Sequence, residues 1–130
     1  MHTKEQLTAY VAESQKFLEE KPGSEPNDII NRIENMAVLI ARSGECLADA
    51  KYYLDQRKND AIELTLTMAK KDGWSISIIH KKIDALCKDD NYLVNKLDRI
   101  NAAATHQLDG LRSILSYRKT EFHTLSYARG

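Results

Sequence analysis

The chain has few helix-breaking residues, few cysteines and no long apolar run. Both prolines lie between positions 22 and 26, and only five glycines occur among 130 residues. Two cysteines are too few for a disulfide framework, and we expect Cys46 and Cys87 to be buried as small apolar residues. Without an apolar signal core or a run that could cross a bilayer, the chain is expected to be soluble and cytoplasmic, with no membrane partner.

The chain also lacks a charge excess and the common catalytic motifs. Basic and acidic residues number 19 each, so no net field attracts nucleic acid or anionic lipid. No glycine-rich phosphate loop, nucleophile elbow or Cys/His catalytic spacing is present. His80 with Asp84, and His106 with Asp109, could each offer two metal ligands, but the Glu-x-x-His pattern of helical di-metal sites is absent. We expect no enzymatic activity, no cofactor and no metal site; a helical enzyme or metal protein is the third hypothesis.

Two apolar ladders with alternating steps of three and four residues dominate what is present. This spacing is typical of helices that pack along a common seam, as in a coiled coil. The first ladder is Ile33, Met36, Ile40, Ser43, Leu47, Ala50, Leu54, Arg57, Ala61, Leu64 and Met68. The second ladder is Ile76, Ile79, Ile83, Leu86, Asp90, Leu93, Leu97, Ile100 and Ala104. The sequence therefore predicts an all-α fold.

The helix breakers predict an elongated antiparallel bundle of three to four helices in a single domain, residues 1–130. The expected helices span about 4–20, 28–71, 76–88 and 91–120. Thr3 with Gln6 fits a capping box at the first helix. Gly73 suits the end of the second helix, and Ser75 can cap the third. Residues 88–91 (KDDN) interrupt the second ladder, so a break or kink is expected there; whether the last two helices are continuous stays open.

A turn near residue 73 would make the two ladders antiparallel neighbours. Facing residues then have numbers that add to about 146, as expected of a helical hairpin. This rule places Arg57, the charged residue of one ladder, opposite Asp89 and Asp90 in the other. We predict a structural ion pair there, because two charged interruptions that face each other are better explained as partners than as two separate exceptions. Removing one partner of such a pair should cost more than the pair itself contributes. Asp89 or Asp90 is also expected to cap the fourth helix.

The first helix is too short to cover the second, at about 25 Å against about 65 Å. The loop at 21–27 is expected to place it beside residues 29–45, which leaves 50–70 and 76–90 as a bare two-helix hairpin. Two helices alone bury little apolar surface. We therefore expect this end to pack on another copy of the chain, as a homodimer, or on another helical protein.

Two groups of polar residues are candidate binding sites. His106, Asp109 and Arg112 lie on adjacent turns of one helix face, as a plain polar stripe or as a polar recognition face. The second group, at the predicted turn, consists of Lys70, Lys71, Lys81 and Lys82. These lysines are either solvated helix ends or, with aromatic residues such as Trp74, contacts for a nucleic-acid backbone.

The segments 91–101 (NYLVNKLDRIN) and 105–113 (THQLDGLRS) resemble small helical proteins encoded in phage and integrated mobile elements. The resemblance covers roughly the last third of the chain. That group has no established activity, so the resemblance implies a phage-type accessory or assembly role and assigns no role to any residue. The leading hypothesis is a non-enzymatic helical bundle acting through protein–protein association; the alternative is a nucleic-acid-binding accessory protein.

Overall fold

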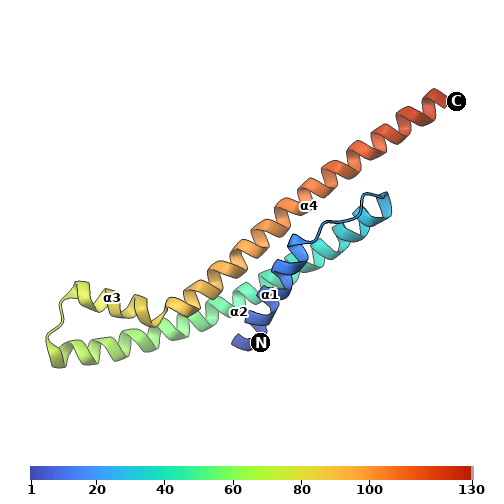
Figure 1. The fold of residues 1–130 in the computed structure, drawn as a ribbon. Helices are drawn as coiled ribbons and strands as arrows, with labels where there is room; N and C mark the ends of the chain where they lie inside the picture. The colour runs from blue at the N-terminus through green and yellow to red at the C-terminus, as the bar shows by residue number, and fades with distance from the viewer. Residues whose placement is uncertain (130) are drawn as a thin grey trace.

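The fold consists of four helices packed along one long axis (Figure 1). The computed structural model describes the backbone of residues 1–129, and all their side chains except those of residues 122 and 126–129. The helices are α1 (Lys4–Glu19), α2 (Pro26–Asp72), α3 (Ile76–Leu86) and α4 (Lys88–Arg129). The structure is 90% helical, with no strand in this range, which confirms the predicted all-α bundle.

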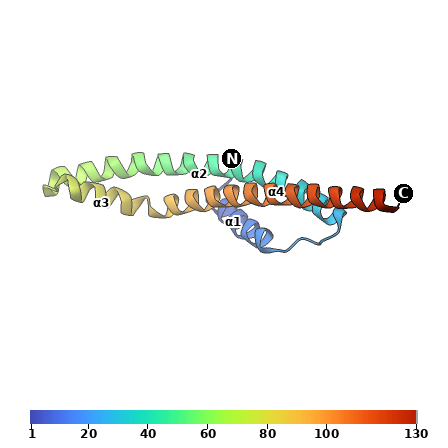
Figure 2. The same ribbon diagram turned by 90° about the horizontal axis from the view of Figure 1, so that it is seen from above.

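Helix α2 runs antiparallel to the arm formed by α3 and α4, and α1 lies on one side of the middle of this pair (Figure 2). The far end of α2 is paired with α3 alone, beyond the reach of α1. At the opposite end, α4 runs on past the start of α2 (Figure 1). The molecule therefore has three helices in its middle and two at the end that contains α3.

The helix ends largely follow the predicted capping chemistry. Thr3 Oγ1 accepts from the Gln6 backbone N–H at 3.1 Å, and Gln6 Oε1 accepts from the Thr3 N–H at 2.9 Å, which completes the capping box. Gly73 ends α2 in the left-handed region, with φ 68°. Ser75 Oγ accepts from the Ile78 N–H at 3.4 Å. Helix α2 begins earlier than expected, at Pro26, because proline is well suited to the first helical position.

The predicted break in the second ladder is present, but at a different residue. It lies at Cys87, with φ −97° and ψ 1°, and α4 starts at Lys88 instead of about 91. Asp89 and Asp90 therefore lie in the first turn of α4, where the helix dipole favours acidic residues, and neither is the N-cap. Helix α4 also continues to Arg129 instead of ending near 120.

One large hydrophobic core lies where three helices meet, and a small one lies at the two-helix end. The large core includes Leu7 and Val11 of α1, Met36, Leu39 and Cys46 of α2, and Leu97, Ile100, Ala104, Leu108 and Leu111 of α4. The small one contains Leu54, Ala61 and Cys87. Both cysteines are buried and free, as the sequence predicted. Since a fully buried large apolar side chain contributes about 1.5–3 kcal/mol, most of the stability lies in the three-helix part.

The buried face of α2 follows an eleven-residue spacing, and the predicted heptad ladder is wrong toward its end. Four residues eleven apart are all buried: Arg32, Ser43, Leu54 and Thr65. The heptad members Leu64 and Met68 are instead 54% and 42% exposed. An eleven-residue repeat gives about 3.67 residues per turn, close to a straight α-helix, whereas a heptad needs supercoiling to about 3.5. Small residues therefore face α3, and large ones are turned outward.

A polar contact fixes the register between α2 and α4. Asn101 Nδ2 donates to the Ile40 carbonyl at 3.0 Å and to Ser43 Oγ at 2.8 Å. Ser43 Oγ also donates to the Ile40 carbonyl, at 3.0 Å. A buried polar group that finds its partners in only one alignment disfavours the neighbouring registers.

Candidate interaction surface

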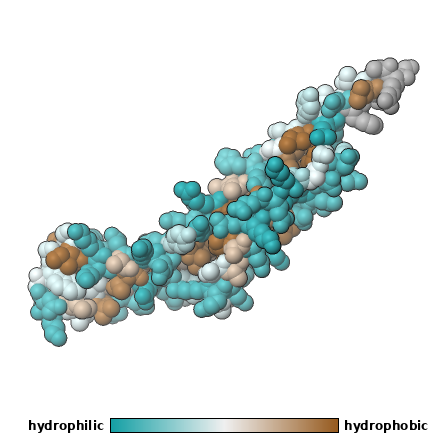
Figure 3. Space-filling view, viewed as in Figure 1, coloured by the Kyte–Doolittle hydropathy of each residue, from teal (hydrophilic) through white to brown (hydrophobic). Residues whose placement is uncertain are grey.

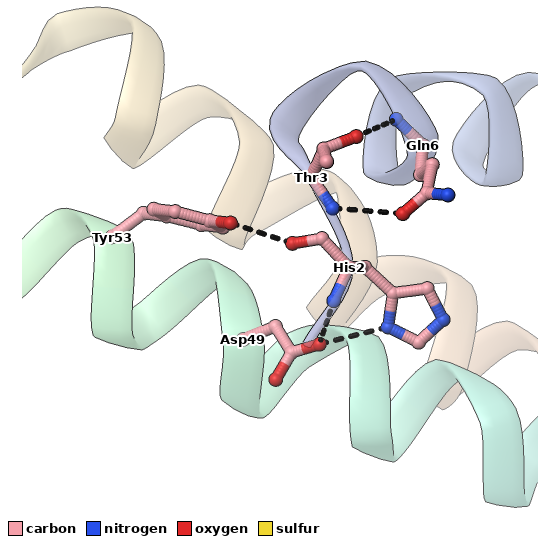
Figure 4. Close-up of polar contacts among 5 residues, drawn as sticks. All are labelled: His2, Thr3, Gln6, Asp49 and Tyr53. Carbon is pink, nitrogen blue, oxygen red and sulfur yellow. Dashed lines mark hydrogen bonds and ion pairs between the residues drawn. The ribbon is translucent and has the colours of Figure 1, made fainter.

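The start of α1 is held on α2 by a polar cluster around His2 (Figure 4). The His2 backbone N–H donates to Asp49 Oδ2 at 3.0 Å, and its ring Nδ1 lies 2.8 Å from the same oxygen. Tyr53 Oη donates to the His2 carbonyl at 2.6 Å. The hydrogen bond from the His2 backbone, and then that from its ring, hold the pKa of Asp49 below its ordinary value.

The end of α1 is held by Arg32, a buried residue of α2. Its Nη2 donates to the carbonyls of Phe17 at 2.7 Å and Glu20 at 2.9 Å, and its guanidinium carbon lies 3.9 Å from the centre of the Phe17 ring. These carbonyls belong to the negative end of α1, which a cation stabilises. Burial lowers the pKa of Arg32 from its ordinary value, an effect that Glu20 opposes.

Between these two ends, α1 is fixed by side-chain bonds to backbone carbonyls. Tyr10 Oη donates to the Leu39 carbonyl at 3.3 Å, and Gln107 Nε2 of α4 donates to the Leu18 carbonyl at 3.0 Å. Together with the contacts of the two ends, these bonds lay α1 antiparallel along α2 from residue 32 to residue 53. The predicted cover, residues 29–45, was too short, because His2, just before α1, is bonded to Tyr53, and Lys4 of the first turn lies over the Tyr53 ring.

The predicted ion pair of Arg57 with Asp89 or Asp90 is wrong. Lys4 Nζ of α1 lies 2.8 Å from Asp90 Oδ1, and Asp90 is only 6% exposed. Arg57 Nε instead donates to the Leu86 carbonyl, at 3.1 Å, at the end of α3. Asp89 is exposed and takes part in neither ion pair found among the described side chains. The facing rule considered two helices only, and no sequence pattern marks Lys4 as the residue that a third helix brings to this seam.

A cleft of about 700 Å³ opens where α1, α2 and the break between α3 and α4 meet. Apolar side chains of Val11, Leu86 and Leu93 line it together with the charged residues Arg57 and Asp89. Its lining carries both signs of charge, so it does not select a simple anion or cation. The cleft marks the point at which the cover provided by α1 ends.

Beyond the cleft lies the two-helix part, here called the hairpin end: residues 54–72 of α2, the turn, and α3. Figure 3 shows apolar surface on it. Six of its large apolar side chains are at least 42% exposed: Ile62, Leu64, Leu66, Met68, Ile76 and Ile78. Beyond Leu54, the buried residues of α2 on its inner side are all small, namely Ala61, Thr65 and Ala69. Large apolar surface left outside in this way is typical of a protein–protein contact site.

The basic residues predicted to gather at the turn do so. Lys70, Lys71, Lys81 and Lys82 are all exposed around it. Lys82 Nζ lies 5.7 Å from the centre of the half-buried Trp74 ring. This cation–π contact engages the ring that the nucleic-acid hypothesis needs for base stacking.

The remaining sequence candidates lie apart from this surface. His106, Asp109 and Arg112 are exposed on α4, and none of them takes part in the ion pairs of the described side chains. His80 and Asp84 are exposed on α3. Over the part of the chain that the structure describes, no group of three or more His, Cys, Asp or Glu residues could hold a metal ion.

Comparison of the chain with protein-family models, with curated proteins and with solved structures finds no match. Among the described residues, no helix combines the length and the apolar character that crossing a bilayer requires. The hairpin end and the cleft beside it are the features of the described residues that bear on function.

Proposed function

We propose that the chain is a non-enzymatic helical protein that works by protein–protein association, and that it associates with itself through the hairpin end. The observation that supports this proposal is the placement of large apolar residues outside and small ones inside this end. Leu64, at 54% exposed, is next in sequence to Thr65, at 2%. A second helical surface would remove the large side chains from water.

Contact through this end would bury apolar side chains that the single chain leaves in water. Full burial of one Leu, Ile or Met side chain contributes about 1.5–3 kcal/mol, and these side chains are already partly covered. Leu64 and Met68 lie on one face of α2 and Ile62 and Leu66 on another, so one partner surface covers one of these two pairs on each copy. The resemblance of residues 91–113 to phage and mobile-element proteins suggests an accessory or assembly role as the setting.

Sedimentation equilibrium or light scattering across the micromolar range tests the proposal. We expect a mass twice the 14.8 kDa of the chain. Replacing Leu64 and Met68 together by Ser should return the mass to that of a monomer. The matched control is Val38→Ser, because Val38 is 56% exposed but lies outside the hairpin end. A monomer at every concentration would contradict the proposal.

A second candidate function is contact with a nucleic-acid backbone at the turn, favoured by the four exposed lysines gathered there. Such binding should weaken steeply as salt rises, and should be lost when Lys70 and Lys81 are changed to Glu. Fluorescence anisotropy with labelled DNA and RNA measures it. No binding at low salt, or binding that salt does not weaken, would dismiss this candidate.

A further inference from the structure

The side of the helix pair that α1 covers continues, uncovered, along the hairpin end. On α2, Arg57 lines the cleft beside α1, and Leu64 and Met68 follow two and three turns later on the same face. On the other arm, Leu86 lines the same cleft, and Ile78 lies about two turns before it. The contact surface of α1 therefore passes directly into an exposed apolar face that includes Leu64, Met68 and Ile78.

The uncovered face is about as long as helix α1. Helix α1 has 16 residues, which span about 24 Å. The part of α2 from Arg57 to Asp72 contains the same number of residues. The hairpin end of a second copy has the same length, so two copies can cover each other over this whole face.

Charge is segregated along the hairpin end. Its distal part, residues 69–82, carries four lysines against one aspartate. Its proximal part, residues 55–63 and 83–86, together with the adjoining residues 87–90, carries six acidic residues against three basic ones; one of the six, Asp90, is buried and paired with Lys4. Antiparallel hairpin ends place each distal part beside the proximal part of the other copy, whereas parallel ones oppose like charges. The segregation thus favours the antiparallel arrangement.

We infer that two copies of the chain overlap their hairpin ends in antiparallel fashion about a two-fold axis, each covering the apolar face that continues the α1 contact of the other. The overlap makes a four-helix bundle from two helices of each copy. The turn of one copy then reaches the cleft of the other, with Lys71 and Lys82 beside the other copy's Asp60 and Asp89. This inference rests on the proposed self-association and adds its direction and partner surface.

Charge reversal of each part in turn tests the direction. One variant carries Lys71→Glu and Lys82→Glu, and the other carries Asp60→Lys and Asp89→Lys. At low salt each alone should have a dissociation constant at least about tenfold higher than that of the original chain, because like charges then meet at both ends. An equal mixture of the two should form a heterodimer with the original affinity. The combined fourfold variant should self-associate again.

The rescue by mixing also shows that both variants are folded, since an unfolded chain could not restore its partner. Lys16→Glu with Arg99→Glu is the matched control for the Lys71→Glu and Lys82→Glu variant. It lowers the net charge by the same amount, at exposed positions outside the hairpin end. Equal weakening by this control, or no weakening by either variant, would overturn the antiparallel arrangement and leave self-association standing. An original chain that is monomeric throughout would remove the proposed function itself.

Discussion

Lys4 Nζ lies 2.8 Å from Asp90 Oδ1, and this contact joins the first turn of α1 to the first turn of α4. The two partners are unequal, because the Asp90 side chain is 7% exposed and that of Lys4 is 47% exposed. The lysine can be solvated without the aspartate, but the aspartate has little access to water. The pair therefore ties the seating of α1 to the break between α3 and α4.

Removing Lys4 should destabilise the protein more than neutralising Asp90. We expect Lys4→Met to lower the free energy of unfolding by about 1–2 kcal/mol, because it leaves a buried carboxylate without its cation. Asp90→Asn should cost less, since the remaining amide carries no charge. Urea unfolding followed by circular dichroism measures both. Lys16→Met, at an exposed position of the same helix, should stay within about 0.5 kcal/mol; an equal loss there would contradict the assignment.

Arg32 should be the most costly single charge to remove. Arg32→Met deletes both bonds to the α1 carbonyls and the contact with Phe17, and should lower the free energy of unfolding by about 3 kcal/mol. Arg32→Lys should recover only part of this, because an ammonium lacks the planar fork. Thermal unfolding of both variants is the measurement, with Arg99→Met on exposed α4 surface as the control. Full recovery by lysine would show that charge alone matters.

The His2–Asp49 contact predicts a loss of stability in acid. The pKa of Asp49 is lowered from its ordinary value of 3.8, mainly by the His2 backbone N–H and then by the His2 ring. The stabilisation is therefore complete above 3.8, declines as pH falls below it, and is absent once pH passes below the lowered pKa. Asp49→Asn should accordingly be less stable than the original chain at pH 5 and equally stable in stronger acid. Urea midpoints for both proteins across this range measure the gap, and a gap independent of pH would rule out this cause.

Asn101 and Ser43 should be energetically coupled. Asn101→Ala removes the donor to the Ser43 hydroxyl and one of the two side-chain donors to the Ile40 carbonyl, and should cost about 1–2 kcal/mol. Adding Ser43→Ala should cost less than the two single changes together, by about 0.5 kcal/mol or more. A double-mutant cycle in urea measures the coupling, with Asn95→Ala as an exposed control. Strict additivity would mean that the hydrogen bond does not form.

The parts of the fold that sequence predicted well are those fixed by local chemistry. The Thr3–Gln6 capping box and the left-handed Gly73 depend only on residues within one turn, so both can be predicted from the local sequence. The helix boundaries near them followed. The long end of α4 did not, because no breaker marks where the α4 pattern stops.

The candidate surface was harder to predict, because it depends on accumulated rotation and on a third helix. The direction of a side chain predicted from a heptad differs from that in a straight helix by about 20° per heptad. The angular difference is negligible at Met36, which is buried, but it has accumulated by Met68, thirty-two residues later, which is exposed. The partner of Asp90 depends on where α1 crosses α4, which neither ladder records. Nor does either ladder show that the residues at the start of α1 reach Tyr53 of α2.

The interruption at Cys87 has a mechanical consequence. One arm of the molecule is a single helix of 47 residues, while the arm beside it is jointed between Leu86 and Lys88. At such a joint the last carbonyls of the first helix lose their intrahelical donors. Arg57, from the continuous helix, donates to the Leu86 carbonyl at 3.1 Å and so bridges the joint from outside. The continuous helix α2 thus spans the joint. The Arg57 hydrogen bond, together with the packing of α2 on α3, holds the hairpin end in line with the rest of the molecule.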